Sequence, residues 1–362
     1  MTIRYGLIGS GMMGQEHIRN IALLEGAVVT AVMDPDPGMR ALSVETSGRT
    51  ARPFDNLGDL LSVDICDAFV VVAPNDTHHQ ILKDVAATNK PILCEKPLCT
   101  TVADCREILS LYRDRSAPVW VAMEYRYMPP VERMIREVES GTTGPLKMMA
   151  IREHRFPFLE KVGDWNRFNA RTGGTLVEKC CHFWDLMRLV LQSDPVRVYA
   201  SAGVDANHLD ERYEGAVPDI LDNAFVVVDF ASGARGMLDL CMFAEGSYWQ
   251  EVISVTGPKA RVDACIPGPA RFSTEGKERA SQVVISDRAS QQVITHEVEV
   301  DHAVLAAGDH HGSTYFQHRK FLEMVRSGSG KPDVTLEDGL WSVRVGEAAE
   351  QSARSGHAVV LT

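Results

Sequence analysis

The chain has 362 residues, of which 45% are hydrophobic and 24% are charged, a composition typical of a globular protein. This length exceeds what one hydrophobic core usually organises, so we expect two domains, residues 1-125 and 126-362. The net charge of −12 argues against a nucleic-acid partner or an anionic membrane surface. The longest apolar run, Ala68 to Ala73, is too short to cross a bilayer.

Localisation follows from the first residues and from the cysteines. The first strand is expected to start at about Ile3, which leaves no room for a secretory signal. The eight cysteines include no CxxC pair, and free thiols in a reducing compartment are the simplest interpretation. We therefore expect a cytoplasmic protein.

The first third of the chain alternates short apolar strands with amphipathic helices, which indicates βαβ units and a doubly wound parallel sheet. The expected strands are Ile3–Ile8, Val28–Met33, Phe69–Ala73, Ile92–Cys94 and Val119–Met123. The expected helices are Gln15–Leu24, His78–Thr88 and Val102–Arg113.

Beyond Met128 the pattern changes to strands of period two, which favours a second α/β domain with an open, mostly antiparallel sheet and one buried face. The expected strands are Lys147–Phe156, Arg197–Gly203, Asn223–Phe230, Arg235–Phe243 and Glu251–Gly257. Helices are expected at Val131–Glu139, Thr175–Leu191, Ser313–Ser327 and Leu336–Ala353.

A glycine-rich turn joins the first strand to the first helix as Gly9-Ser10-Gly11-Met12-Met13-Gly14. In this GxGxxG pattern Gly9 permits the tight turn, Gly11 lets the backbone approach a pyrophosphate, and Gly14 lets the helix pack on the strand. Asp34 ends the second strand, where a carboxylate accepts hydrogen bonds from the adenosine ribose and repels a 2′-phosphate. The pattern predicts a Rossmann domain that binds NAD, with NADP the less favoured alternative.

Further motifs resemble the glucose–fructose oxidoreductase / inositol dehydrogenase (Gfo/Idh/MocA) family of NAD(P)-dependent enzymes. They are Cys94-Glu95-Lys96-Pro97, Gly173-Gly174 followed by Glu178, His182 and Asp185, Ala73-Pro74-Asn75 with His78, and Leu336-Glu337-Asp338-Gly339. The resemblance covers essentially the whole chain and implies a substrate cleft between the two domains. It also implies that Pro74, Asn75, His78, Glu95 and Lys96 lie beside the cofactor, together with Met12 and Met13.

The helix that carries Glu178 and His182 offers an acid–base pair. Positions 178, 182 and 185 lie on one helical face, so Glu178 is expected to orient the imidazole of His182. Histidine suits the removal of a hydroxyl proton near neutral pH. Lys96 would hold the substrate hydroxyl, whereas Asp185 is expected to be structural. The family usually has an aspartate where this chain has Glu178, and Lys179 replaces a small or apolar residue.

A basic, aromatic segment precedes that helix and suggests the substrate. Its candidate substrate-binding residues are Arg152, His154, Arg155, Trp165 and Arg167. Aromatic faces suit sugar rings, and guanidinium groups suit anions, so we expect a sugar or glycoside that is anionic or heavily hydroxylated. The alternative is an exposed loop whose cations pair with Glu153, Glu160 and Asp164.

Three functions fit these residues. The leading hypothesis is NAD-dependent oxidation of a secondary ring hydroxyl of a sugar, glycoside or cyclitol. The second is an NAD-dependent glycoside hydrolase that oxidises the ring transiently, eliminates the aglycone, adds water and reduces the ketone again. The third, a non-catalytic NAD sensor, is least compatible with Lys96, Glu178 and His182.

Two expectations concern metals and assembly. We assign no metal, because His310 and His311 lack companion ligands at metal spacing in the sequence. The family resemblance implies a homodimer or homotetramer formed through the open sheet.

Overall fold

The N-terminal domain is a parallel sheet whose strand order reverses at its centre. The computed structural model describes residues 1–272, 276 and 279–361. The strand order is β3-β2-β1-β4-β5-β6, all parallel. The strands are β1 (Ile3–Ile8), β2 (Ala27–Met33), β3 (Arg52–Phe54), β4 (Ala68–Val71), β5 (Ile92–Cys94) and β6 (Val119–Val121). The reversal between β1 and β4 creates the crevice in which such sheets bind ligands.

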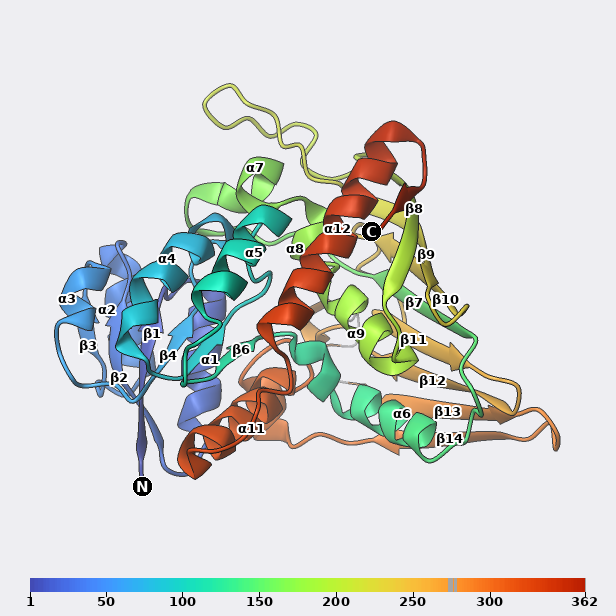
Figure 1. The fold of residues 1–362 in the computed structure, drawn as a ribbon, viewed down its shortest axis with the longest axis horizontal. Coiled ribbons are helices and arrows are strands. Elements are labelled where there is room, and N and C mark those ends of the chain that lie inside the picture. The colour runs from blue at the N-terminus through green and yellow to red at the C-terminus, as the bar shows by residue number, and fades with distance from the viewer. Residues whose placement is uncertain (273–275, 277–278, 362) are drawn as a thin grey trace.

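Helices flank this sheet (Figure 1), as the predicted βαβ pattern requires. They are α1 (Met12–Ala22), α2 (Pro37–Thr46), α3 (Leu57–Leu61), α4 (His78–Val85) and α5 (Val102–Leu111), with the short turns η1 (Asn75–Thr77) and η2 (Ala86–Thr88). The doubly wound parallel sheet predicted from the sequence is confirmed, and β3 is an additional strand.

The C-terminal domain is built on a nine-stranded sheet of order β14-β13-β12-β11-β7-β10-β9-β8-β15. Its strands are β7 (Met148–His154), β8 (Pro195–Gly203), β9 (Asn223–Phe230), β10 (Arg235–Cys241), β11 (Glu251–Thr256), β12 (Ala260–Ile266), β13 (Ser281–Asp287), β14 (Val293–Val298) and β15 (Val359–Val360). Within the described residues β7 and β10 run parallel and the other neighbouring pairs run antiparallel. The expected mostly antiparallel sheet is therefore confirmed.

One face of this sheet is covered and the other is open. Burial alternates along β9 and β10, and the buried positions face the helices.

The remaining elements are η3 (Glu124–Tyr127), α6 (Pro129–Glu139), η4 (Val162–Arg167), α7 (Asn169–Thr172), α8 (Thr175–Glu178), α9 (Cys181–Leu191), η5 (Ala270–Phe272), α10 (His302–Ala306), α11 (Ser313–Ser327) and α12 (Leu336–Ser355).

The helix predicted over Thr175–Leu191 is wrong in one respect. It is interrupted after Glu178, and α9 begins at Cys181. The carbonyl of Glu178, at the end of α8, accepts from Lys96 Nζ at 3.2 Å and from Cys181 Sγ at 3.2 Å. Neither glycine nor proline marks this break, so the periodicity of the sequence did not reveal it.

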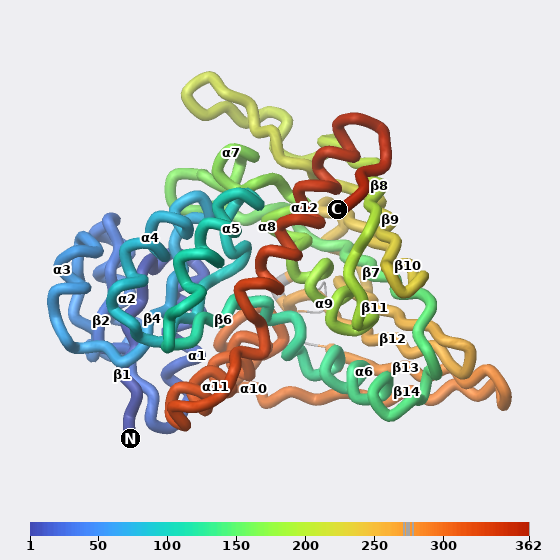
Figure 2. The backbone as a smooth tube through the Cα atoms, in the orientation of Figure 1, coloured from blue at the N-terminus to red at the C-terminus, as the bar shows by residue number. Residues whose placement is uncertain are grey.

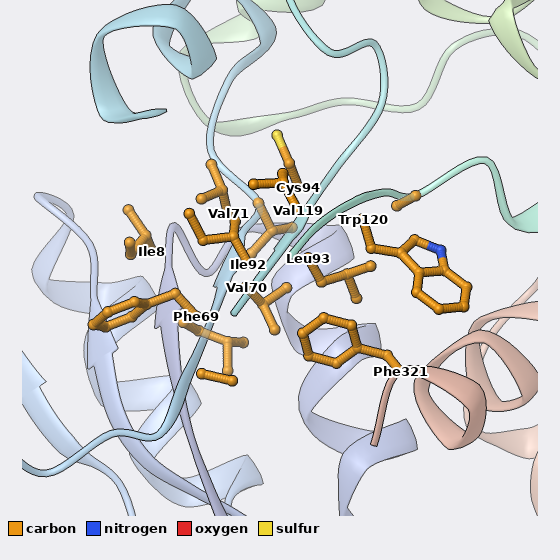
Figure 3. Packing of buried hydrophobic residues seen from close by; sticks show 14 of the residues in the cluster. Ile8, Phe69, Val70, Val71, Ile92, Leu93, Cys94, Val119, Trp120 and Phe321 are labelled. Carbon is orange, nitrogen blue, oxygen red and sulfur yellow. The ribbon is translucent and has the colours of Figure 1, made fainter. Parts of the chain in front are cut away.

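Helix α11 comes from the C-terminal part of the chain but completes the core of the N-terminal domain. Phe321 is fully buried in the same cluster as Val70 and Leu93, and its ring meets Trp120 at a centroid distance of 6.2 Å (Figure 3). The backbone trace shows α11 lying beside the first domain although it follows strands β7 to β14 of the second sheet in sequence (Figure 2). The N-terminal domain therefore depends on residues more than 300 positions from its start.

Helix α12 runs between the two domains (Figure 1) and contributes to both cores. Two glycines allow close packing. A Cβ on Gly339 would lie 3.0 Å from Leu98 Cβ, next to the loop that carries Lys96. A Cβ on Gly346 would lie 2.6 Å from the carbonyl oxygen of Leu176 in α8. The same helix thus fixes the positions of two separate parts of the cleft.

None of the helices in the described part of the chain is both long enough and apolar enough to cross a bilayer.

The buried ion pair of Arg126 and Asp185 yields a stability prediction. Asp185 accepts two hydrogen bonds from the Arg126 guanidinium, and their side chains are 1% and 9% exposed respectively. Asp185→Ala would leave a buried cation unpaired, so we expect the free energy of unfolding to fall by about 3–5 kcal/mol. Chemical denaturation measures this change.

The matched control is Lys83→Ala, which breaks an exposed pair with Glu107 on α5. It should cost less than about 1 kcal/mol. Equal losses for the two variants would contradict a structural role for the buried pair.

Candidate functional site

The glycine-rich turn opens onto a cleft of about 740 Å³ at the reversal of the strand order. Gly9 has φ +90°, and a Cβ there would lie 2.6 Å from the carbonyl oxygen of Val72, so only glycine fits. A Cβ on Gly11 would meet nothing within 4 Å. The backbone at Gly11 therefore borders open space of the kind that a pyrophosphate requires.

Most of the predicted cofactor residues line this cleft. They are Gly9, Gly11, Met12, Met13, Asp34, Pro74, Asn75, Glu95 and Lys96. Asp34 follows β2, and its carboxylate accepts from the amides of Ser10 at 2.7 Å and Asp36 at 2.9 Å. The Arg40 guanidinium donates to the carbonyls of Asp34 and Pro35. The carboxylate of Asp34 is thus held in the cleft wall, where the adenosine ribose is expected.

Gly14 and His78 are not among the residues described as lining the cleft, so their contact with the cofactor stays a prediction. A Cβ on Gly14 would lie 3.1 Å from the carbonyl oxygen of Gly9, so Gly14 serves helix packing. The imidazole of His78 is fully buried and contacts the carbonyls of Pro97 at 2.8 Å and Ala73 at 3.0 Å. His78 thus links the loop that contains Ala73 to the loop that contains Pro97.

A second cavity of about 450 Å³ adjoins the first and shares Met12, Met13, Lys96 and Lys161 with it. The three predicted catalytic residues, Lys96, Glu178 and His182, all line this second cavity. They come from the end of β5, from α8 and from α9. The structure therefore places them together between the two domains.

Lys96 links the domains through its ammonium group, which donates to the carbonyl of Glu178 at 3.2 Å. Burial lowers the pKa of Lys96, but neighbouring groups, with Cys181 and Glu178 foremost, raise it above its ordinary value. The side chain is accordingly a cation at neutral pH, and it lies where the two cavities meet.

Glu178 does not hold His182 in the expected way. Its Oε1 accepts from Lys161 Nζ at 3.3 Å, and its buried Oε2 has no hydrogen-bond partner within the described chain. Burial lowers the pKa of Lys161, an effect that the carboxylate of Glu178 opposes. The pairing of Glu178 with His182 is therefore a wrong prediction, because α8 ends between them.

The imidazole of His182 instead stacks on Tyr125, with ring centroids 4.2 Å apart and an interplanar angle of 12°. Its Nδ1 is buried and has no partner among the described residues. Burial, followed by the charges of Lys96 and Lys179, lowers the pKa of His182 well below the usual value. At neutral pH the imidazole is therefore uncharged and able to accept a proton.

The predicted substrate residues divide between the cavities and the rest of the domain. Arg155 lines the second cavity, and Trp165 lines the cofactor cleft, where Lys161 Nζ lies 4.3 Å from its ring. Arg152, His154 and Arg167 are outside the described lining of both cavities, so their role in substrate binding stays a prediction. The Arg167 guanidinium pairs with Glu211 at 2.9 Å.

The geometry of strand β7 explains why Arg152 and His154 lie away from the cavities. Burial alternates along it, and Arg152 and His154 lie on the face opposite to the fully buried Glu153. His154 pairs with Asp239 at 3.0 Å on that face. A period of two therefore turns alternate basic residues away from the cavity.

A group missed by the sequence analysis forms another wall of the second cavity. Glu16 of α1, Glu124 of η3 and His310 before α11 meet there, and the Thr314 hydroxyl bonds both carboxylates. Burial opposes the charge, but Glu124 and Glu16 raise the pKa of His310 to about 9. Their ligand atoms lie within 4.8 Å of one another, a spacing that a metal ion could bridge. The assignment of no metal remains a prediction, and chain spacing held no signal for this cluster.

Comparison with known families decides the classification. The model of the oxidoreductase family's NAD-binding Rossmann fold matches residues 3–123, and that of its C-terminal alpha/beta domain matches residues 135–361. The chain belongs to the Gfo/Idh/MocA family. The resemblance expected from the motifs is thereby confirmed, and so are the oxidoreductase class and NAD as the cofactor of this Gfo/Idh/MocA protein.

The chain is similar in sequence to two inositol dehydrogenases and in fold to a levoglucosan dehydrogenase. The inositol 2-dehydrogenase of Ralstonia nicotianae is 28% identical over 83% of this chain and 84% of its own. The myo-inositol 2-dehydrogenase of Thermotoga maritima is 25% identical over 99% and 98%. A levoglucosan dehydrogenase solved with NADH shares the fold, with a TM-score of 0.82, 18% identity and full coverage of both chains.

The open space at Gly11 predicts a selective effect on NAD binding. Gly11→Val should fold normally, because a Cβ at this position meets no protein atom within 4 Å, yet it should weaken NAD binding at least about tenfold by blocking the pyrophosphate. Calorimetric titration with NAD measures the affinity, and thermal melting measures the stability.

Gly246→Val is the matched control, since a Cβ there also meets nothing within 4 Å but lies outside the described cleft wall. Gly9→Ala, in contrast, should lower the melting temperature. Unchanged NAD affinity in Gly11→Val would refute the proposed position of the pyrophosphate.

Proposed function

We propose that this protein oxidises a secondary ring hydroxyl of a sugar, glycoside or cyclitol and passes the hydride to NAD. The observation that carries the proposal is that Lys96 and His182 line one cavity, which opens beside the dinucleotide cleft at Lys96. Relatives that are named inositol 2-dehydrogenases support a polyol or sugar as the substrate.

The chemistry divides between cofactor and protein. NAD, when bound, supplies the acceptor for the hydride. The uncharged imidazole of His182 accepts the hydroxyl proton as the carbonyl forms. The ammonium of Lys96 holds the same oxygen and stabilises the negative charge that develops on it. Glu178, paired with Lys161, balances the positive charge of this wall.

An anionic or heavily hydroxylated substrate is favoured by the cavity lining. Arg155 and Lys161 bring cationic groups to it, and Phe156 and Phe158 bring aromatic faces. The Arg155 guanidinium lies 4.3 Å from the ring of Phe156. Guanidinium groups bind carboxylate, sulfonate or phosphate, and aromatic faces bind sugar rings.

The redox-neutral glycoside hydrolase is the second candidate, and His310 is the observation that favours it. A hydrolase of this type needs an additional acid to protonate the departing aglycone. The imidazolium of His310, which Glu124 and Glu16 keep protonated, lines the same cavity as His182. Such a group could donate that proton.

One assay separates the two candidates. The protein is incubated with NAD and a panel of cyclitols, free sugars and aryl glycosides, including anionic ones, while NADH and released aglycone are recorded. We expect stoichiometric NADH without cleavage. Cleavage without net NADH would instead establish the hydrolase, and neither product from any compound would contradict both proposals.

With a responsive substrate, His182→Ala should lower kcat about 10²–10⁴-fold through loss of the base. Lys96→Ala should lower it about 10²–10³-fold through loss of charge stabilisation. His79→Ala and Lys83→Ala are matched controls on α4, where both side chains pair with Glu107 at the surface. Wild-type rates in the first two variants would remove the proposed roles.

We further propose a homo-oligomer that is formed through the open face of the second sheet. Tyr199, Val227 and Met237 are paired across β8, β9 and β10, and each is more than 40% exposed. The neighbouring Phe225 is 62% exposed. Contiguous apolar rows of this kind on a soluble protein usually mark a contact with another protein.

Light scattering after size exclusion tests this assembly. The wild type should run as a dimer or tetramer, and Phe225→Glu with Val227→Glu should dissociate it, because charges in an apolar interface are costly. Leu111→Glu, at a similarly exposed apolar position on α5, should have no effect. A monomeric wild type would contradict the proposal.

A further inference from the structure

The orientation of the His182 ring must be fixed by a residue other than Glu178. A catalytic imidazole needs a group that fixes its plane, and Glu178, the expected one, is paired with Lys161. His182 is 2% exposed, and its Nδ1 lacks a partner within the described chain. What holds the ring is therefore a packing contact.

That contact is the phenol ring of Tyr125, which lies nearly parallel to the imidazole at 4.2 Å. Tyr125 is 1% exposed and is itself fixed on several sides. Its Oη accepts from Lys179 Nζ at 2.5 Å and donates to Glu251 Oε1 at 3.4 Å. Phe183 packs edge-on against the same ring at 5.8 Å.

Lys179 is in turn anchored inside the protein. Its ammonium is 2.8 Å from Glu153 Oε1, and the two side chains are 5% and 0% exposed respectively. The ammonium also lies 4.7 Å from the centre of the Tyr125 ring. Glu153 and Glu251 are directly paired on β7 and β11, so this anchor belongs to the sheet of the second domain.

We propose that Tyr125 and Lys179 are positioning residues for His182. Lys179, fastened to Glu153, holds the Tyr125 ring flat against the imidazole and so fixes the plane in which the imidazole meets the substrate hydroxyl. This inference rests on the proposed role of His182 as the base. It also gives a function to Lys179, one of the two residues at which this chain departs from the usual family pattern.

The anchor has an electrostatic effect as well. The cationic groups that act most strongly on the imidazole are Lys96 at the end of β5, Lys179 between α8 and α9, Arg155 after β7 and His310 before α11. After burial, these cations lower the pKa of His182. The base is active when it is unprotonated, so activity is lost as pH falls through this pKa. Removing the charge of Lys179 raises the pKa and moves the acidic limb of kcat to higher pH.

The first test uses kinetics with the compound that gives NADH or aglycone in the substrate panel. Tyr125→Leu should lower kcat about 10-fold to 100-fold with unchanged NAD affinity, because a misplaced base costs rate rather than cofactor binding. Tyr125→Phe, which keeps the ring, should lose less. Lys179→Met should move the acidic limb of the pH profile of kcat to higher pH, and Lys179→Arg should return the limb to its wild-type position.

The second test does not depend on turnover. In protein that carries isotope-labelled histidine, the His182 Hε1 signal is assigned by its absence in His182→Gln. Tyr125→Leu should shift this signal by removing the ring current, whereas Tyr125→Phe should leave it nearly unchanged. If Lys179→Met alone has a much lower melting temperature, the double variant Lys179→Met with Glu153→Gln takes its place. The double variant removes both charges of the buried pair and so leaves no unpaired carboxylate.

The outcomes separate the two proposals. If His182→Ala keeps wild-type turnover, the role of His182 as the base fails, and the NMR signal still decides whether Tyr125 holds the ring. If His182 is required but the Tyr125 and Lys179 variants keep the wild-type kcat, acidic limb and His182 signal, the positioning proposal is overturned.

Discussion

The close packing of α12 against both domains is the constraint on which the cleft depends. Gly339 leaves room for Leu98, two residues beyond Lys96, and Gly346 leaves room for the backbone of Leu176 in α8. The carboxylate of Glu350, further along the same helix, accepts from the Leu176 amide at 3.0 Å. Helix α12 therefore sets the distance between the cleft residues of the first domain and those of the second. Side chains at Gly339 and Gly346 would push the two domains apart.

Buried pairs of opposite charge surround the second cavity. Lys161 pairs with Glu178, Lys179 with Glu153, and His310 with Glu16 and Glu124. Lys96, in contrast, meets a carbonyl oxygen rather than a carboxylate. Buried ions require partners because their desolvation is costly, and each pair here restricts where a side chain can lie. The uncharged His182 thus lies among cations whose positions are largely fixed, which favours a base that is free of its proton.

The sequence was sufficient for the architecture and for the backbone that lines the first cleft. Strict spacing located Gly9, Gly11 and Asp34, because a GxGxxG turn imposes its geometry within a few residues. The short strand Arg52–Phe54 and the strands from Ala260 to Val298 escaped, since brief or polar strands carry weak periodicity.

The side-chain part of the site could be predicted only in outline. The motifs singled out Lys96 and His182, which line one cavity, but they did not reveal the partner of Glu178, because Lys161 approaches from another segment of the chain. Tyr125, Glu16 and His310 likewise come together only through tertiary packing. Contacts between distant segments leave no periodic trace in one sequence. The insertion of Phe321 into the first core also bears on how the chain matures. During synthesis the nucleotide-binding domain emerges about 200 residues before α11, so its core can be completed only after Phe321 has left the ribosome.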